Sequence, residues 1–258
     1  MSELATSLRL SWHVVVRNWT VYRKDFLANI SPTLADPALM MTALGLGLSP
    51  FIGDIDGLSY AQYLGPGLVA TTALFTSFFE SSYGFYVRMT FESVYKAMLT
   101  TPIGVREVVL GEFIWVFIRA ALMAGGVGIV LMVMGLVHNP LALLLFPLIG
   151  GTLAVPCGAI GLLAAAHVRN INQFQTVYSF LIAPIYFLSA VFFPLAEGSV
   201  MGRIVQLSPF YHGVRLLQMS AWNRWTVTEA LYHTGALIIF SIVLCWWADR
   251  SIGKKLTA

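Results

Sequence analysis

Long apolar segments constrain the fold of this chain more than any other feature. Six stretches of about 20 residues carry almost no charge: residues 27–48, 63–86, 113–137, 141–166, 174–193 and 230–247. A bilayer core of roughly 30 Å needs about 20 apolar residues per helix. Charged residues make up only 10% of the chain, against about 25% in soluble domains. The sequence therefore predicts an all-α integral membrane protein with six transmembrane helices.

The distribution of Lys and Arg predicts the orientation. Eleven of them fall on one side of the predicted spans: Arg9, Arg17, Arg23, Lys24, Arg88, Lys96, Arg106, Arg169, Arg250, Lys254 and Lys255. The other side holds only Arg203, Arg215 and Arg224. Cytoplasmic loops carry the excess of positive charge, so both termini and the loop at 87–112 are expected in the cytoplasm. This pattern accounts for the net charge without any nucleic-acid partner.

Residues 5–25 have the pattern of an amphipathic helix instead of a cleavable signal peptide. Basic and apolar side chains separate onto two sides: Arg9, His13, Arg17 and Lys24 against Leu8, Trp12, Val15, Val16 and Trp19. A basic stripe opposite a face that contains Trp is typical of a helix lying in the membrane interface. The alternative is an ordinary helix packed on another domain.

The polar segment at 87–112 interrupts the apolar chain. A short helix is predicted over Phe91–Leu99, with Phe91, Tyr95 and Met98 on one face and Glu92 and Lys96 spaced for an i, i+4 pair. Thr100, Thr101 and Pro102 then end it. Such a helix held out in water suggests a docking surface; the alternative is a solvated loop helix that binds nothing.

Besides Asp36, which interrupts the first predicted span, two charges lie inside predicted spans, where a bilayer makes them costly. Glu80 precedes Arg88 by eight residues, and Arg119 follows Glu112 by seven. In antiparallel helices both lie roughly 10–12 Å above the cytoplasmic surface, so we expect an ion pair between them. Its role is left open between a structural clasp and a polar contact for substrate head groups.

Aromatic residues gather in the spans at 63–86 and 174–193. Phe79, Tyr83, Tyr178 and Tyr186 are candidates to line a path, because sugars stack their C–H faces on aromatic rings. Contact with lipid and anchoring at the interface are the competing explanation, which covers most aromatic residues of membrane proteins.

Sequence motifs for chemistry are missing. The chain has no P-loop, no G-x-S-x-G and no H-E-x-x-H motif. Its two cysteines and five histidines lack metal-ligand spacing. We therefore predict no catalytic residue, no metal site and no cofactor in this chain; if ATP is used, another polypeptide binds it.

Several short runs together resemble a known family. They are FESSYG at 79–84, AMLTTPI at 97–103, EVVLGE at 107–112, LGPGL at 64–68, FFP at 192–194 and LSPFYHG at 207–213. In order and spacing they are similar to the ABC-2 family of ATP-binding-cassette permeases. Within it they resemble the NodJ-type branch, which is associated with the export of lipo-oligosaccharides.

The resemblance implies a single transmembrane domain over 1–258. It implies an amphipathic helix before the first span and short re-entrant helices in the external region at 194–229, here 198–206 and 209–221. It also implies a coupling helix that seats in an ATPase, carried by Phe91, Glu92, Tyr95, Lys96 and Met98. The working unit would be two permeases in membrane lipid and two ATPases that bind ATP and Mg, in the bacterial inner membrane.

The resulting expectation is the permease subunit of an exporter for an amphipathic glycolipid or lipo-oligosaccharide. A drug or antibiotic efflux permease of the same family is the alternative. An ion-coupled secondary transporter is more remote, because the spans lack paired acidic residues and an inverted repeat.

Overall fold

The computed structural model describes residues 3–137, 139–195 and 198–257, and within them the regular structure is helical throughout. The first half comprises α1 (Glu3–Tyr22), η1 (Arg23–Asp25), α2 (Phe26–Met40), η2 (Met41–Leu46), α3 (Gly47–Ile52), α4 (Tyr60–Phe79), η3 (Glu80–Gly84), α5 (Phe85–Thr90) and α6 (Val94–Leu99). The second half comprises α7 (Val105–Val133), α8 (Pro140–His167), α9 (Gln173–Val177), η4 (Tyr178–Ile182), α10 (Ala183–Leu188), α11 (Val200–Val205), α12 (Pro209–Trp222) and α13 (Val227–Thr257).

Four helical stretches of the described chain are long and apolar enough to cross a membrane: Leu4–Ile52, Val105–Val133, Pro140–His167 and Val227–Leu256. The other two predicted spans also coincide with helices. Residues 63–86 lie on the continuous stretch of α4, η3 and α5, which carries several hydroxyl side chains and a glutamate. Residues 174–193 lie on α9, η4 and α10, which end early at Leu188. The fold is thus that of an all-helical membrane protein, in which four helical stretches are by themselves long and apolar enough to cross a membrane.

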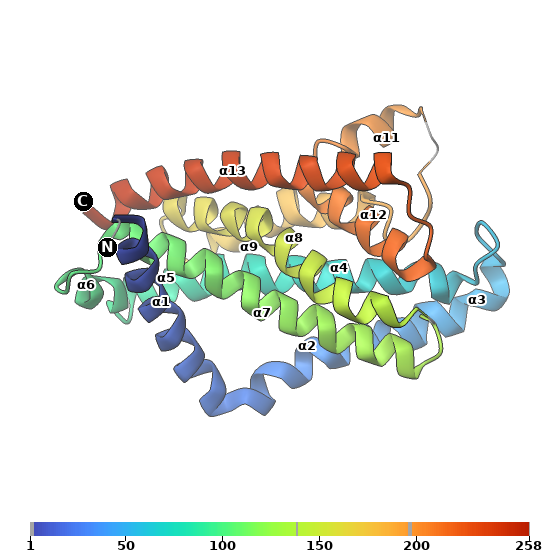
Figure 1. Cartoon of the computed structure of the whole chain (residues 1–258), viewed down its shortest axis with the longest axis horizontal. Coiled ribbons are helices and arrows are strands. Elements are labelled where there is room, and N and C mark those ends of the chain that lie inside the picture. Colours follow the sequence, from blue (N-terminus) through green and yellow to red (C-terminus); the bar gives the residue numbers. More distant parts are fainter. Residues whose placement is uncertain (1–2, 138, 196–197, 258) are drawn as a thin grey trace.

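The long helices run side by side along the longest axis of the molecule (Figure 1). One end gathers both termini with α1, α5 and α6, and the opposite end gathers α3, α11 and α12. The chain bends sharply at η1, so α1 and α2 form two arms of a V. The segment that was predicted to be cytoplasmic therefore shares one end of the molecule with both ends of the chain.

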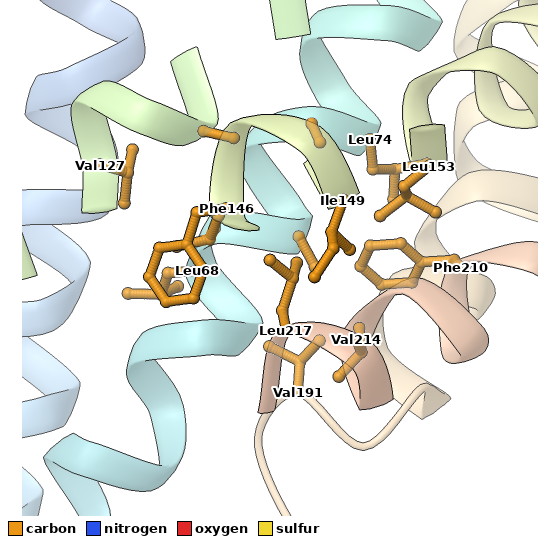
Figure 2. Packing of buried hydrophobic residues seen from close by; sticks show 14 of the residues in the cluster. Leu68, Leu74, Val127, Phe146, Ile149, Leu153, Val191, Phe210, Val214 and Leu217 are labelled. Carbon is orange, nitrogen blue, oxygen red and sulfur yellow. The ribbon is translucent and has the colours of Figure 1, made fainter. Parts of the chain in front are cut away.

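The core lies where α4, α7, α8 and α12 meet (Figure 2). Leu68, Phe146 and Leu217 are fully buried there, with Leu153 and Phe210 beside them. Small residues let the helices approach closely, as expected for membrane helices. A Cβ at Gly161 of α8, for example, would lie 2.8 Å from the carbonyl oxygen of Phe78.

Helix α1 packs on α7 through a face that the sequence did not single out. Ser11, Val14 and Asn18 are buried, and Gly111 of α7 makes the approach possible, because a Cβ there would lie 2.6 Å from Val14 Cβ. Of the predicted apolar face only Val15 is buried. The remaining members stay exposed: Leu8, Trp12, Val16 and Trp19.

Candidate functional site

A cavity of ≈ 870 Å³ opens between α2, α4, η3, α7, η4 and α10. Its wall combines three kinds of side chain. The aromatic members are Phe75, Phe79, Tyr178 and Tyr186; the charged ones are Asp36, Glu80 and Arg119; the hydroxyl-bearing ones include Thr33, Thr71, Thr72 and Thr76. An apolar cavity with a few convergent polar groups is the usual form of a small-molecule site.

Helical periodicity explains why these residues face the same cavity. On α2, residues 32, 36 and 40 lie one turn apart, and on α4 the residues 68, 72, 75 and 79 do the same. Each of the three π-helical segments that the structure describes also contributes a lining residue: Ala43 of η2, Glu80 of η3 and Tyr178 of η4. Single π turns within α-helices are frequent at functional sites.

Three of the four aromatic residues proposed for a path line this cavity. Phe79 stacks on Tyr178 with ring centroids 6.0 Å apart, and the ring of Phe75 lies 5.1 Å from that of Tyr186. Tyr83 does not line the cavity; its ring lies 4.7 Å from Phe174, toward α9. The cluster therefore joins α4 to η4 and α10 across the cavity wall.

Glu80 and Arg119 are paired through Arg119 Nη1 and Glu80 Oε2. The second carboxylate oxygen of Glu80 accepts from Arg88 Nη1 at 2.7 Å and from Trp115 Nε1 at 3.1 Å. One glutamate thus holds two guanidinium groups. The expected pair is therefore one part of a larger arrangement of charges.

Arg88 links this pair to the loop at 87–112. Its Nη2 donates to Glu112 Oε2 at 2.8 Å and its Nε to Tyr95 Oη at 2.9 Å, while Tyr95 Oη donates to Glu112 Oε1 at 2.9 Å. Asn18 of α1 donates to the same Glu112 oxygen at 3.0 Å. We call Glu80, Arg88, Tyr95, Glu112, Trp115 and Arg119 the polar network. It runs from α6 to the cavity wall.

Burial shapes the chemistry of the polar network. Glu112 is 1% exposed and Glu80 9%, so each carboxylate needs a cation beside it. Desolvation by burial, reinforced by the Glu112 carboxylate, raises the pKa of Tyr95 well above its usual value. The Tyr95 hydroxyl therefore stays protonated and remains a hydrogen-bond donor at neutral pH.

The predicted docking helix differs from the structure in three respects. Helix α6 begins only at Val94, because Ser93 adopts a left-handed conformation with φ 53°. Tyr95 is 1% exposed and stacks on Phe85 with ring centroids 4.5 Å apart, so its side chain lies inside the protein and not on the surface of the predicted docking helix. Phe91, Glu92 and Lys96 are exposed. Glu92 does not pair with Lys96; its Oε2 lies 3.7 Å from Nη2 of Arg17 on α1. Met98 is half-buried.

The sequence did contain a signal for two further members of the polar network, Arg88 and Glu112. Glu80 and Arg88 are about two helical turns apart, and so are Glu112 and Arg119 on the antiparallel helix. The depth argument that pairs Glu80 with Arg119 also pairs Arg88 with Glu112. The count of basic residues assigns Arg88 to the loop at 87–112 and does not reveal its partners, and Trp115 carries no comparable signal.

Helices long and apolar enough to cross a membrane, with a largely apolar cavity between them that holds a few charged groups, are the arrangement expected of a membrane transport protein. Residues 9–222 match the model of the ABC-2 type transporter family, so the chain belongs to that family. The predicted resemblance is thereby confirmed.

Three individual proteins are similar to this chain over most of its length. Nodulation protein J of Rhizobium leguminosarum bv. viciae is 30% identical over 236 residues, or 91% of this chain and 90% of that protein. The same protein of the bv. trifolii strain is 30% identical over 249 residues, covering 96% and 94%. The inner membrane transport permease YadH of Escherichia coli (strain K12) is 23% identical over 93% of this chain and 95% of its own length.

Proposed function

We propose that the chain is the permease subunit of an ATP-driven exporter. With a second copy it forms the membrane path for an amphipathic glycolipid or lipo-oligosaccharide, and a separate ATPase supplies the energy. The observation that carries this proposal is the ≈ 870 Å³ cavity whose aromatic and threonine-bearing wall is joined by buried charges to α6. Aromatic rings can stack on sugar faces, and hydroxyl groups can bond sugar hydroxyls.

The topology that we propose has six spans in one domain, with both termini and α6 in the cytoplasm of a bacterium. Helix α1 lies in the cytoplasmic interface, and exposed Trp12 and Trp19 support that placement. Helices α11 and α12 form the re-entrant external region. The gathering of both termini with α6 at one end of the molecule supports this arrangement (Figure 1).

The ATPase docks on the exposed residues before and on α6, chiefly Phe91, Glu92 and Lys96. Tyr95, which points inward, passes the movement of α6 to Arg88 and Glu112. Glu80 and Arg119 then carry it to the cavity wall, because Arg88 and Arg119 share the Glu80 carboxylate. The polar network is in this proposal the mechanical link between ATP binding and the path.

A second copy completes the path on the side of α2 and η4. Helix α2 has no buried residue, and Phe180 of η4 is 83% exposed. Both elements flank the cavity. A facing copy would cover these apolar surfaces and close the cavity toward lipid.

Co-purification from native membranes tests the ATPase partner. A tagged wild-type chain is expected to retain an ATPase, whereas Phe91→Asp with Lys96→Glu loses it because the docking residues change from apolar and basic to acidic. Leu207→Asp is the matched control, since Leu207 is equally exposed near the opposite end of the molecule. Recovery of the wild-type chain without any ATPase would contradict the proposal.

An efflux permease for drugs or antibiotics is the second candidate. The aromatic cluster of Phe75, Phe79, Tyr178 and Tyr186 would bind a flat hydrophobic drug as readily as a sugar. Stimulation of the complex's ATPase activity separates the two. An alkyl glycoside should stimulate more strongly than the alkanol of equal chain length, and the reverse order would favour drug efflux.

A further inference from the structure

Asp36 differs from the other charged side chains of the cavity wall because it has no ion-pair partner among the described residues. The charged side chains in the cavity wall are Asp36, Glu80 and Arg119. Glu80 and Arg119 bind each other, and Glu80 also holds Arg88. No hydrogen bond or ion pair joins Asp36 to any residue that the structure describes. The wall therefore carries one carboxylate that has no cationic partner among the described residues.

The depth of Asp36 makes this arrangement costly. It follows Phe26, the first residue of α2, by ten residues, which places it about 15 Å along the helix. With the start of α2 at the edge of a bilayer core of roughly 30 Å, Asp36 lies near the middle of that core. Arg23 and Lys24 lie about three turns away, near the start of that helix. Ionisable residues at such depth usually face a water-filled cavity or a path and serve binding.

Aromatic rings line the same cavity. Phe75, Phe79, Tyr178 and Tyr186 contact one another in pairs with centroids 5.1–6.1 Å apart. The π faces of such rings attract organic cations, and the attraction increases when water is excluded. A carboxylate in a cavity that aromatic rings also line is a combination that recognises ammonium groups and disfavours anions.

We propose that the substrate carries a protonated amino group, which Asp36 binds inside the cavity against the aromatic cluster. The inference rests on the proposed function and narrows its cargo to cationic amphiphiles, such as a glycolipid with a free amine on its sugar. Neutral and anionic analogues of the same shape bind more weakly, because the carboxylate then loses water without gaining a counter-charge.

Two matched probes test the proposal: dodecyl glucosaminide and its N-acetyl derivative, which differ in the charge of one nitrogen. Binding is measured on the purified permease in polyoxyethylene micelles, which contain neither sugar nor amine, at a mildly acidic pH that keeps the amine protonated. The wild-type chain should bind the amine at least about ten-fold more tightly than the acetylated probe. Asp36→Asn should remove this preference and leave the affinity for the acetylated probe unchanged.

Two variants serve as controls. Asp36→Glu keeps the charge and should keep the preference for the amine. Asp54→Asn removes a carboxylate from the exposed loop after α3, outside the cavity, and should behave as wild type. If Asp36→Asn does not fold, Asp36→Ala takes its place, because it also removes the carboxylate and should lose the preference for the amine.

Equal affinity of the wild-type chain for both probes would overturn the proposal, as would an undiminished preference in folded Asp36→Asn. Dissociation of a permease dimer by Asp36→Asn without a change of preference would also overturn it, because Asp36 would then face a second copy. The binding assay needs no ATPase. Preserved discrimination without ATP-driven transport would therefore refute the proposed exporter while supporting the amine site.

Discussion

Glu80 accepts hydrogen bonds from two arginines, and this detail decides how the Glu80–Arg119 pair responds to mutation. Arg88 and Arg119 both contact its carboxylate, and Trp115 donates to it as well. A clasp made of one acid and one base would tolerate reversal of both charges. A carboxylate shared between two bases cannot, because an arginine at position 80 would face Arg88.

Charge reversal at this pair tests the shared carboxylate. Glu80→Arg and Arg119→Glu should each impair assembly and transport, and the double reversal should not restore either. Leaving a buried charge without its partner costs about 3–5 kcal/mol, which a lowered unfolding temperature in detergent will report. Rescue by the double reversal would show that Arg88 contributes nothing to the pair.

Tyr95 allows the link between α6 and the cavity to be weakened with little loss of packing. Tyr95→Phe keeps the ring on Phe85 and removes the hydroxyl between Arg88 and Glu112. We expect a loss of stability of about 1–3 kcal/mol, together with basal ATPase activity that substrate no longer stimulates. Full substrate stimulation in Tyr95→Phe would remove Tyr95 from the coupling mechanism.

At the scale of elements, the contact of α1 with α7 depends on one glycine. A Cβ at Gly111 would lie 2.6 Å from Val14 Cβ and 2.7 Å from the Ser11 carbonyl oxygen. Gly111→Leu should therefore push α1 away, at a cost of about 1–3 kcal/mol for overpacking. Hydrogen exchange over residues 3–22 will report this as loss of protection. Gly235→Leu on α13 is the control, since nothing lies within 4 Å of its Cβ position.

The sequence predicted most helices because apolar blocks of this length have few other solutions in a bilayer. It predicted the end of α6 at Leu99 but not its beginning. Ser93 takes a left-handed conformation, which shortens the predicted helix at 91–99 and turns Tyr95 inward. Residue spacing cannot reveal such a turn, because arguments from spacing assume a regular helix. The sequence likewise did not indicate a role for Asp36, which the structure places in a cavity that aromatic rings also line.

At the scale of the whole molecule, the exposed surfaces of α2 and η4 predict how two copies meet. A single cysteine at Phe180, in a chain without Cys157 and Cys245, should form a cross-linked dimer in membranes with a bifunctional reagent. Ile242→Cys on α13 is the control, as its side chain is also well exposed but lies on a helix remote from the cavity lining. Cross-linking at Ile242 alone would place the dimer interface on α13 instead.

ATP-driven uptake of a fluorescent alkyl glycosaminide into inside-out proteoliposomes tests the central claim most directly. The liposomes contain the permease and the ATPase that co-purifies with it. We predict that the probe accumulates only with ATP and both subunits, and that Tyr95→Phe reduces the uptake without preventing assembly. Accumulation driven by an ion gradient in the absence of ATP, or uptake by the permease alone, would contradict the account.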